Sequence, residues 1–129
     1  MKANQLRIGN YVMDNNDFIM QVSLIDSFND TIYCDFEGNT GDNFEFDINN
    51  PPKPIPLTRE LLLKCKHHFI YSKYDLIKYD KYLISQDKDN DCYVLYDGNS
   101  MVAITRFTYL HQYQNIISAL TGQELIINI

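Results

Sequence analysis

Three groups of residues have types and spacings that could support chemistry, and the first is an acidic run. Asp87, Asp89 and Asp91 alternate along the chain as the first ligands of a calcium-binding loop do. Such a loop needs glycine at its sixth position and glutamate at its twelfth, where this sequence has Cys92 and Gly98. We therefore predict that the run is a solvated hairpin turn without calcium.

The second group combines a cysteine with two histidines. Cys65 is closely followed by His67 and His68, but zinc requires about four convergent nitrogen or sulfur ligands. No other cysteine or histidine forms a paired spacing with them, and adjacent residues of a strand point to opposite faces. A cysteine nucleophile would need a histidine base brought beside it, yet each cysteine lies in an apolar run, which is typical of a small buried side chain. The sequence therefore predicts no metal site, no cofactor and no enzymatic activity.

The third group is a set of imidazole, amide and hydroxyl side chains on one face of a predicted helix. These candidate binding residues are His111, Gln112, Gln114, Asn115 and Ser118. An exposed helix face usually carries charged residues, so this composition favours a hydrogen-bonding surface for a protein partner, another subunit or a ligand. The alternatives are an ordinary polar face and a face buried against the N-terminal sheet. Arg7 and Arg106 are secondary candidates for contact with an anion.

The helix that carries this face is predicted over residues 108–122. Its apolar face is indicated by the helical spacing of Leu110, Tyr113, Ile117 and Leu120. Thr108 is the expected N-cap, and Gly122 is the expected residue in left-handed conformation after the last turn. We expect this helix to cover the apolar face of a sheet.

The N-terminal part of the chain alternates short strand-like runs with turn-forming residues. Strands are predicted over residues 6–13, 18–25, 31–36 and 44–48. The second run should bury one face, formed at period two by Phe18, Met20, Val22 and Leu24. The segment 8–12 resembles the first strand of SH3-like barrels, with a plain antiparallel meander as the alternative.

Four prolines within residues 51–56 separate this part from the rest, because proline cannot donate a hydrogen bond to a sheet. Thr58 is then the expected N-cap of a short helix. Further short strands follow over residues 69–71, 74–79, 82–85, 92–96 and 101–107. We predict an α+β fold: an antiparallel sheet over residues 1–50, a proline-rich connector over 51–56, and a helix–antiparallel strands–helix unit over 57–129.

Composition restricts the class of protein. The chain has 129 residues, a formal net charge of −6 and an apolar fraction of 45%, which suit a folded acidic domain and disfavour binding to nucleic acid or anionic membranes. Three cysteines without a C-x-x-C pair favour reduced thiols and a cytoplasmic location, and no signal peptide or membrane span is expected. The apolar tail over residues 124–129 should pack on the body or on another subunit, so we predict a homo-oligomer.

Both ends and the middle of the chain resemble a family of small proteins from Bacteroidetes, their phages and mobile elements. Members open with M-K-A-N-E-L-R-I-G-N, have a central P-L-T-E-E-W-L-like helix start and close with H-x-L-Q-N-L-x-x-A-L-T-G-E-E-L. The matching segments here are 1–12, 55–58, 111–115 and 119–125. The sequence departs from the pattern at Gln5, Arg59, Leu61 and Gln123.

This family has no established activity, so the resemblance implies an origin in the cytoplasm of a bacterial host cell and no mechanism. The leading hypothesis is a non-enzymatic binding or adaptor protein of a phage or mobile element. One alternative is a counter-defence protein that sequesters a small nucleotide signal at an oligomer interface. The other is a small hydrolase.

Overall fold

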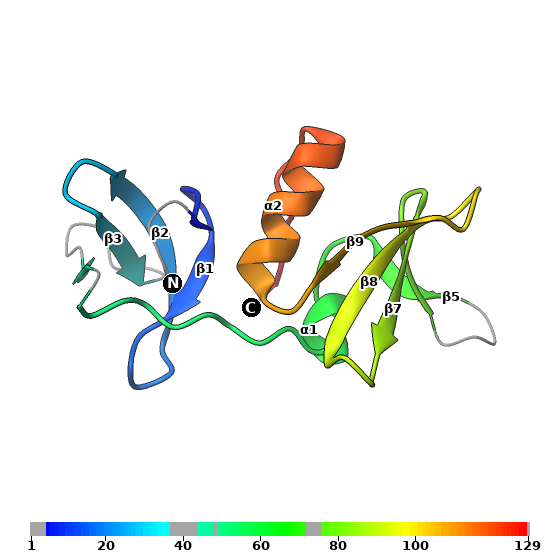
Figure 1. Cartoon of the computed structure of the whole chain (residues 1–129), viewed down its shortest axis with the longest axis horizontal. Coiled ribbons are helices and arrows are strands. Elements are labelled where there is room, and N and C mark those ends of the chain that lie inside the picture. Colours follow the sequence, from blue (N-terminus) through cyan, green and yellow to red (C-terminus); the bar gives the residue numbers. More distant parts are fainter. Residues whose placement is uncertain (1–4, 37–43, 48, 72–75, 129) are drawn as a thin grey trace. The chain divides into compact units, whose positions relative to one another are not determined.

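The computed structural model describes residues 5–36, 44–47, 49–71 and 76–128, which form two antiparallel sheets and two helices (Figure 1). The fold is therefore α+β. The chain divides into two compact units. Unit 1 comprises Met1–Ile55 and Tyr109–Asn115, and unit 2 comprises Pro56–Thr108 and Ile116–Ile129. Helix α2 is shared between them, so neither unit is one continuous stretch of chain.

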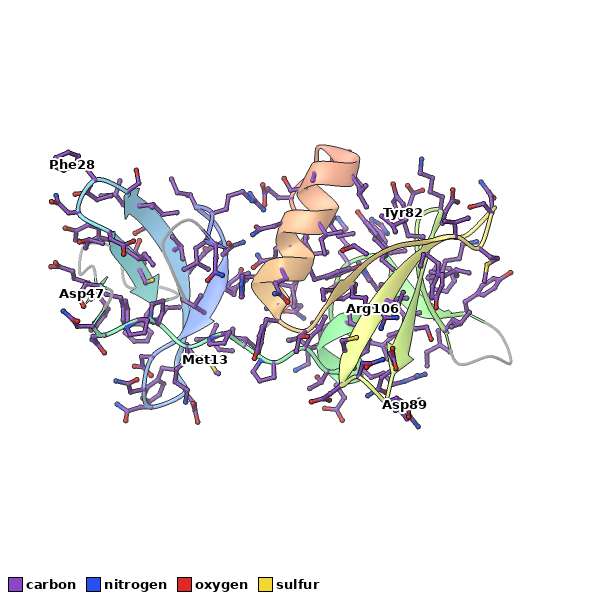
Figure 2. The ribbon with its side chains drawn as sticks, in the orientation of Figure 1. Met13, Phe28, Asp47, Tyr82, Asp89 and Arg106 are labelled. Atoms are coloured by element: carbon purple, nitrogen blue, oxygen red, sulfur yellow. The ribbon has the colours of Figure 1, made fainter. Side chains whose placement is uncertain are left out.

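Unit 1 contains a four-stranded antiparallel meander in which each strand pairs with the next along the chain. Its strands are β1 (Tyr11–Met13), β2 (Ile19–Asp26), β3 (Thr31–Phe36) and β4 (Phe44–Phe46). The predicted strand over residues 31–36 agrees with β3, whereas the predicted strand over 44–48 extends into a residue outside the described ranges. Phe28, in the turn between β2 and β3, is 95% exposed (Figure 2).

The first predicted strand, over residues 6–13, is too long because a tight turn precedes β1. The Asn10 N–H donates to the Arg7 carbonyl at 3.0 Å, and Gly9 between them has a φ of 95°. A turn with positive φ at its third residue favours glycine, which has no Cβ to clash. The turn is closed further by the Arg7 N–H, which donates to the Asn10 side-chain oxygen at 2.7 Å.

Four residues were predicted to form the buried face of the second strand, and the prediction is correct for two of them. Met20 and Val22 are buried, but a bulge between Val22 and Leu24 shifts the pairing of β2 with β3. Because an inserted residue reverses the inward and outward alternation, Leu24 is exposed. Phe18 precedes the strand and is also exposed. The core of unit 1's sheet consists of Leu6, Val12, Met20, Val22, Ile32, Cys34 and Phe46.

The proline-rich segment is held by the backbone of the first sheet. The Lys53 N–H donates to the Met13 carbonyl, and the Met13 N–H donates to the Lys53 carbonyl, both at 2.8 Å. Pro52 and Ile55 are buried. The residue between two prolines thus supplies the pairing that the prolines themselves cannot.

Unit 2 contains a five-stranded antiparallel sheet whose strands also pair in chain order. Helix α1 (Arg59–Leu63) precedes the strands β5 (His68–Tyr71), β6 (Leu76–Tyr79), β7 (Tyr82–Asp87), β8 (Cys92–Asp97) and β9 (Ala103–Phe107). Residues 74 and 75 of the predicted strand lie outside the described ranges. The acidic run between β7 and β8 forms a hairpin turn, as predicted.

The predicted termini at Thr58 and Gly122 are correct, whereas the N-cap predicted at Thr108 is wrong. Thr58 caps α1, because its hydroxyl accepts the Leu61 N–H at 3.1 Å. Helix α2 (Leu110–Thr121) begins two residues after Thr108, and Tyr109 occupies the N-cap position, where its N–H donates to the Gln112 side chain at 3.0 Å. Gly122 ends α2 with a φ of 71°.

The predicted apolar face of α2 is correct for three of its four residues. Leu110, Tyr113 and Ile117 are fully buried, but Leu120 is 40% exposed because the helix ends immediately after it. The tail that follows is tied to the end of α1, since the Lys66 N–H donates to the Ile126 carbonyl at 2.7 Å. Within the described part of the chain, no helix has both the length and the apolar character needed to span a membrane.

Candidate functional site

Two of the predicted binding residues, Gln114 and Asn115, bind the turn before β1 inside unit 1. The Gln114 side chain accepts the Tyr11 N–H at 2.9 Å and donates to the Gly9 carbonyl at 3.1 Å. The Asn115 side-chain oxygen accepts hydrogen bonds from the Asn10 amide at 2.8 Å and from the Arg7 Nε at 3.1 Å. We call Gln114 and Asn115 the amide clamp.

Burial of the amide clamp selects one of the alternatives left open by the sequence. Gln114 is 2% exposed and Asn10 is fully buried, so these amides face the N-terminal turn rather than solvent. An amide suits such a place because it donates and accepts at once without bringing a charge into the interior.

The remaining residues of the predicted polar face are dispersed. His111 is 5% exposed and stacks beside Tyr109, and burial lowers its pKa. Among the described residues, none offers a hydrogen-bond partner to His111 Nδ1. Gln112 caps the helix, and Ser118 is half-buried. A shallow hollow of about 410 Å³ is lined by Gln5, Pro54, Tyr109, His111 and Gln112.

The two candidate arginines each contact groups of the chain itself. Arg7 binds the amide clamp, donating also to the Gln114 carbonyl at 3.4 Å. Arg106 forms an ion pair with Asp87 at 2.5 Å and donates to Cys92 Sγ at 3.6 Å. Hydrogen bonds from Asn90 and then Arg106 lower the pKa of Asp87 to about 2. Both arginines are therefore engaged within their own units.

Two of the three thiols, those of Cys34 and Cys65, are buried. Burial raises the pKa of Cys34 and of Cys65 to about 12, which suppresses their thiolate forms. His68 stacks on Tyr79 with ring centroids 4.3 Å apart, and burial lowers its pKa. Among the described residues, no three His, Cys, Asp or Glu side chains are grouped so that they could hold a metal ion.

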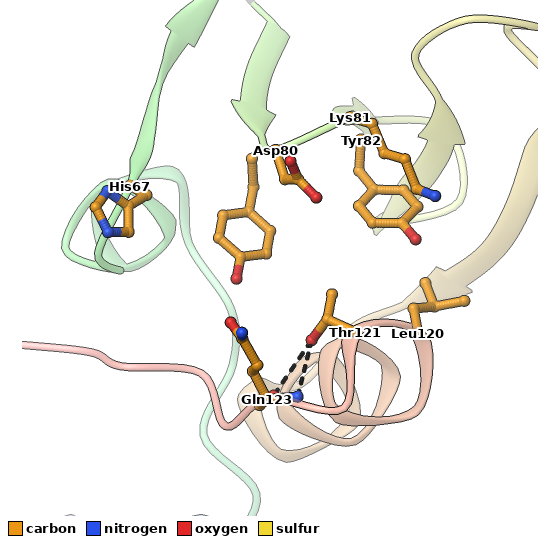
Figure 3. A pocket seen from close by; sticks show the side chains of 8 residues that line it. His67, Asp80, Lys81, Tyr82, Leu120, Thr121 and Gln123 are labelled. Atoms are coloured by element: carbon orange, nitrogen blue, oxygen red, sulfur yellow. Dashed lines mark hydrogen bonds between the residues drawn. The ribbon is translucent and has the colours of Figure 1, made fainter.

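A larger cavity, of about 500 Å³, lies within unit 2, and we call it the turn pocket. Its lining residues are His67, Tyr79, Asp80, Lys81, Tyr82, Leu120, Thr121 and Gln123. Figure 3 shows His67, Asp80 and Tyr82 facing Leu120, Thr121 and Gln123 at the end of α2. The pocket is therefore formed where the turn before β5, the β6–β7 turn and the end of α2 converge.

The backbone conformation of the turns determines where the lining residues of the turn pocket lie. His67 and Asp80 have φ values of 65° and 53°, a left-handed conformation that histidine and aspartate adopt more readily than most residues. The β6–β7 turn is anchored by the Gly98 N–H, which donates to the Lys81 carbonyl at 2.8 Å. A Cβ atom at Gly98 would lie only 2.6 Å from that carbonyl oxygen, so the close approach requires glycine.

The turn pocket offers one carboxylate together with side chains that can both donate and accept hydrogen bonds. Asp80 contributes a carboxylate, and Gln123 together with the tyrosine and threonine hydroxyls contributes neutral oxygens. The end of α2 adds the negative pole of a helix, with no basic residue in its last turn. Lys81 is the opposing charge, but its Nζ lies over the Tyr82 ring, 5.6 Å from the centroid.

The sequence does not reveal this pocket, because its residues come from three turns that are distant along the chain. The only local signal is the strand–Asp80-Lys81–strand pattern of a short hairpin. Comparisons of the chain with protein-family models, with curated proteins and with solved structures found no match.

Proposed function

We propose that this protein is a non-enzymatic adaptor that binds a basic segment of a partner protein, with an arginine side chain in the turn pocket. The observation that carries the proposal is the convergence of Asp80, the negative end of α2 and several neutral oxygens around one cavity. A guanidinium group has five N–H donors and no acceptor, so it can bind the Asp80 carboxylate and neighbouring neutral oxygens at the same time.

The charge of the whole chain supports the same class of partner. A formal net charge of −6 attracts basic segments over distances of about one Debye length, roughly 8–10 Å at physiological salt. The pocket itself adds selectivity, because Asp80 can form a charge-assisted hydrogen bond with a bound cation. Lys81 would remain over Tyr82 and would leave the carboxylate available.

The competing hypotheses have less support from the described residues. Sequestration of a nucleotide requires cationic groups for its phosphates, whereas the turn pocket offers Lys81 beside Asp80 at the negative end of a helix. A hydrolase with a cysteine nucleophile requires a thiolate, whereas burial raises the pKa of both Cys34 and Cys65 to about 12.

The biological setting is part of the proposal and rests on the family resemblance. We place the protein in the cytoplasm of a bacterial host, encoded by a phage or mobile element of Bacteroidetes. The four-stranded meander of unit 1 is proposed to be an SH3-like module, supported by its short strands and by the bulge in β2. The chain is proposed to self-associate through its tail.

The pocket is tested by titrating N-acetyl-arginine amide into ¹⁵N-labelled protein and recording amide chemical shifts. We expect shifts concentrated at His67, Asp80, Lys81 and Gln123, with weaker effects from N-acetyl-lysine amide and none from N-acetyl-glutamate amide. Arginine should exceed lysine because it can satisfy several acceptors at once.

Asp80→Asn is the decisive variant, and Asp89→Asn is its matched control. Both aspartates are exposed turn residues of unit 2, so the two variants remove the same charge. Asp89 lies at the opposite end of β7 from Tyr82, which lines the pocket (Figure 2). If both variants weakened arginine binding equally, binding would depend on the total charge of the protein and not on the turn pocket, which would contradict the proposal.

A further inference from the structure

Strand β5 is an edge of the five-stranded sheet and exposes three consecutive apolar residues. Phe69, Ile70 and Tyr71 are 52%, 51% and 40% exposed. In a strand, successive side chains point to opposite faces, so both faces are partly exposed along β5, although Lys78 Nζ lies over the Tyr71 ring. Isolated exposed apolar residues are ordinary, but a continuous apolar strand at a sheet edge is a template for pairing with another strand.

The backbone of β5 is arranged for such pairing. The His68 N–H donates to the Cys65 carbonyl at 3.2 Å, outside the ladder with β6. In an antiparallel pair the residues that bond to the neighbour alternate with residues whose N–H and C=O point away. Ile70, two residues beyond His68, therefore directs its backbone donor and acceptor towards the open edge.

Strand β5 is short, with four residues, but it carries none of the charges or irregularities that protect many edges. Its sequence, His-Phe-Ile-Tyr, has no lysine, proline or bulge, whereas the opposite edge strand β9 carries Arg106 and a shifted register against β8. Natural edges that are not binding sites are commonly blunted by such charges and irregularities. The two edges of the same sheet thus differ in how open they are to an added strand.

We infer that β5 is the docking edge for an extended segment of the partner protein, which adds a strand beside Ile70 and places its basic side chain in the turn pocket. This inference rests on the proposed function of the pocket. His67, which lines the pocket, immediately precedes β5, and Tyr79 of the pocket pairs with His68. A strand lying along Ile70 would therefore reach the pocket within a few residues, at roughly 3.3 Å per residue.

The chemistry of the edge and the pocket defines the partner segment. Main-chain hydrogen bonds to Ile70 require an extended backbone, and exposed Phe69 and Tyr71 favour apolar or aromatic residues on one face. The Asp80 carboxylate in the turn pocket favours a basic side chain near one end of that segment.

The test selects short random peptides, displayed on phage, against the intact protein and against its Ile70→Lys variant. Ile104→Lys is the matched control, because Ile104 is an exposed isoleucine on the opposite edge strand, β9. We expect enriched peptides to combine alternating apolar residues with an arginine or lysine. Their affinity should fall by about tenfold or more in Ile70→Lys and stay within about threefold in Ile104→Lys, as judged against typical interface contributions.

Hydrogen exchange of the unmodified protein provides a second readout that needs no variant. Binding of an enriched peptide should slow exchange of the Ile70 amide, because an added strand accepts its hydrogen bond. Unchanged exchange at Ile70, or equal loss of affinity in both lysine variants, would overturn docking at β5. Dimers of the free protein that Ile70→Lys dissociates would also overturn it, since β5 would then serve self-association.

Different results would overturn the proposed function of the turn pocket and the docking of a segment at β5. Peptides that need Ile70 but lack basic residues, and that bind Asp80→Asn normally, would support docking at β5 but would overturn both the basic side chain in the turn pocket and the proposed function. Peptides that need Asp80 but bind Ile70→Lys normally would overturn the docking edge while the proposed function stands.

Discussion

At the scale of single residues, the amides of α2 illustrate why a polar side chain is not by itself a binding site. Gln114 and Asn115 occupy positions where an exposed helix would carry lysine or glutamate, and their type suggested a recognition surface. They instead satisfy the backbone of the turn around Gly9 and the side chains of Asn10 and Arg7. A buried turn needs such partners, because unpaired backbone groups are costly away from water.

The amide clamp leads to a prediction about two glutamines of the same helix. Gln114→Ala removes the acceptor of the Tyr11 N–H and one of two donors to the Gly9 carbonyl, which keeps Gln21, and we expect it to lower the free energy of unfolding by about 1–3 kcal/mol. Gln112→Ala removes a cap on the exposed side of α2 and should cost about 1 kcal/mol or less. Urea unfolding of both variants provides the comparison. A larger loss for Gln112→Ala would contradict the structural role of the clamp.

Buried histidines make stability depend on pH. Burial lowers the pKa of His111 below the ordinary value of 6.5, and it does the same for His68. The unfolded chain therefore binds protons more readily than the folded protein, so the free energy of unfolding should fall as the pH drops below about 6.5. Carboxyl groups protonate mainly below about pH 5, outside this window.

Urea unfolding at pH 7.5 and pH 5.5 tests this prediction. The wild type should be less stable at the lower pH, and His111→Gln should show a smaller difference because one of the two histidines no longer titrates. The comparison uses the change with pH within each protein, so a general loss of stability in the variant does not affect it. A pH response identical to that of the wild type would show that His111 does not contribute.

At the scale of elements, the sequence predicts best those features that depend on local chemistry. Thr58 caps α1 and Gly122 ends α2 as predicted, since each acts through hydrogen bonds or φ values within a few residues. The hairpin after β7 follows from its run of turn-forming residues. The α+β class follows from the same short elements.

The sequence does not predict features that depend on contacts between residues far apart along the chain. Leu24 fits a period-two pattern, yet the bulge in β2 turns it outward, and no residue type marks that bulge. Leu120 fits the helical pattern, but it lies at the last turn and faces the turn pocket. The pocket itself requires three turns to converge, which spacing along the chain does not reveal.

The β6–β7 turn gives a prediction at this scale. Gly98→Ala places a Cβ 2.6 Å from the Lys81 carbonyl oxygen, so the turn must shift. We expect a loss of about 1–3 kcal/mol in the free energy of unfolding, as for other overpacked sites, together with weaker binding of N-acetyl-arginine amide. Asn99→Ala is the control, because its backbone N–H donates to Asp97 and is kept, so the change should stay within about 0.5 kcal/mol.

At the scale of the whole molecule, the two units are interleaved along the chain. Unit 1 needs Tyr109–Asn115, which follow unit 2's strands in the sequence. We therefore expect a fragment of residues 1–55 to lack cooperative unfolding, since the turn around Gly9 loses the amide clamp. Adding a synthetic peptide of residues 108–122 should restore dispersed amide signals in part. A fragment that unfolds cooperatively at the urea midpoint of the full chain would contradict this dependence.

The tail carries an exposed apolar side chain on a hydrogen-bonded backbone. Its backbone is fixed, since the Lys66 N–H donates to the Ile126 carbonyl and the Asn128 N–H donates to the Lys64 carbonyl. Leu125 is buried, whereas Ile126 is 60% exposed and held in place by these bonds. A fixed apolar side chain loses little entropy on association, so it suits the centre of a self-complementary contact.

We accordingly predict that light scattering at micromolar concentration gives a mass above that of the 15.2 kDa chain. Ile126→Glu should reduce the mass to that of the monomer without changing the urea midpoint, because the side chain contributes to association and not to the core. A chain truncated after Glu124 should be both monomeric and less stable, since it also loses buried Leu125. A monomeric wild type, with the truncated chain merely less stable, would show that the tail acts only within its own chain.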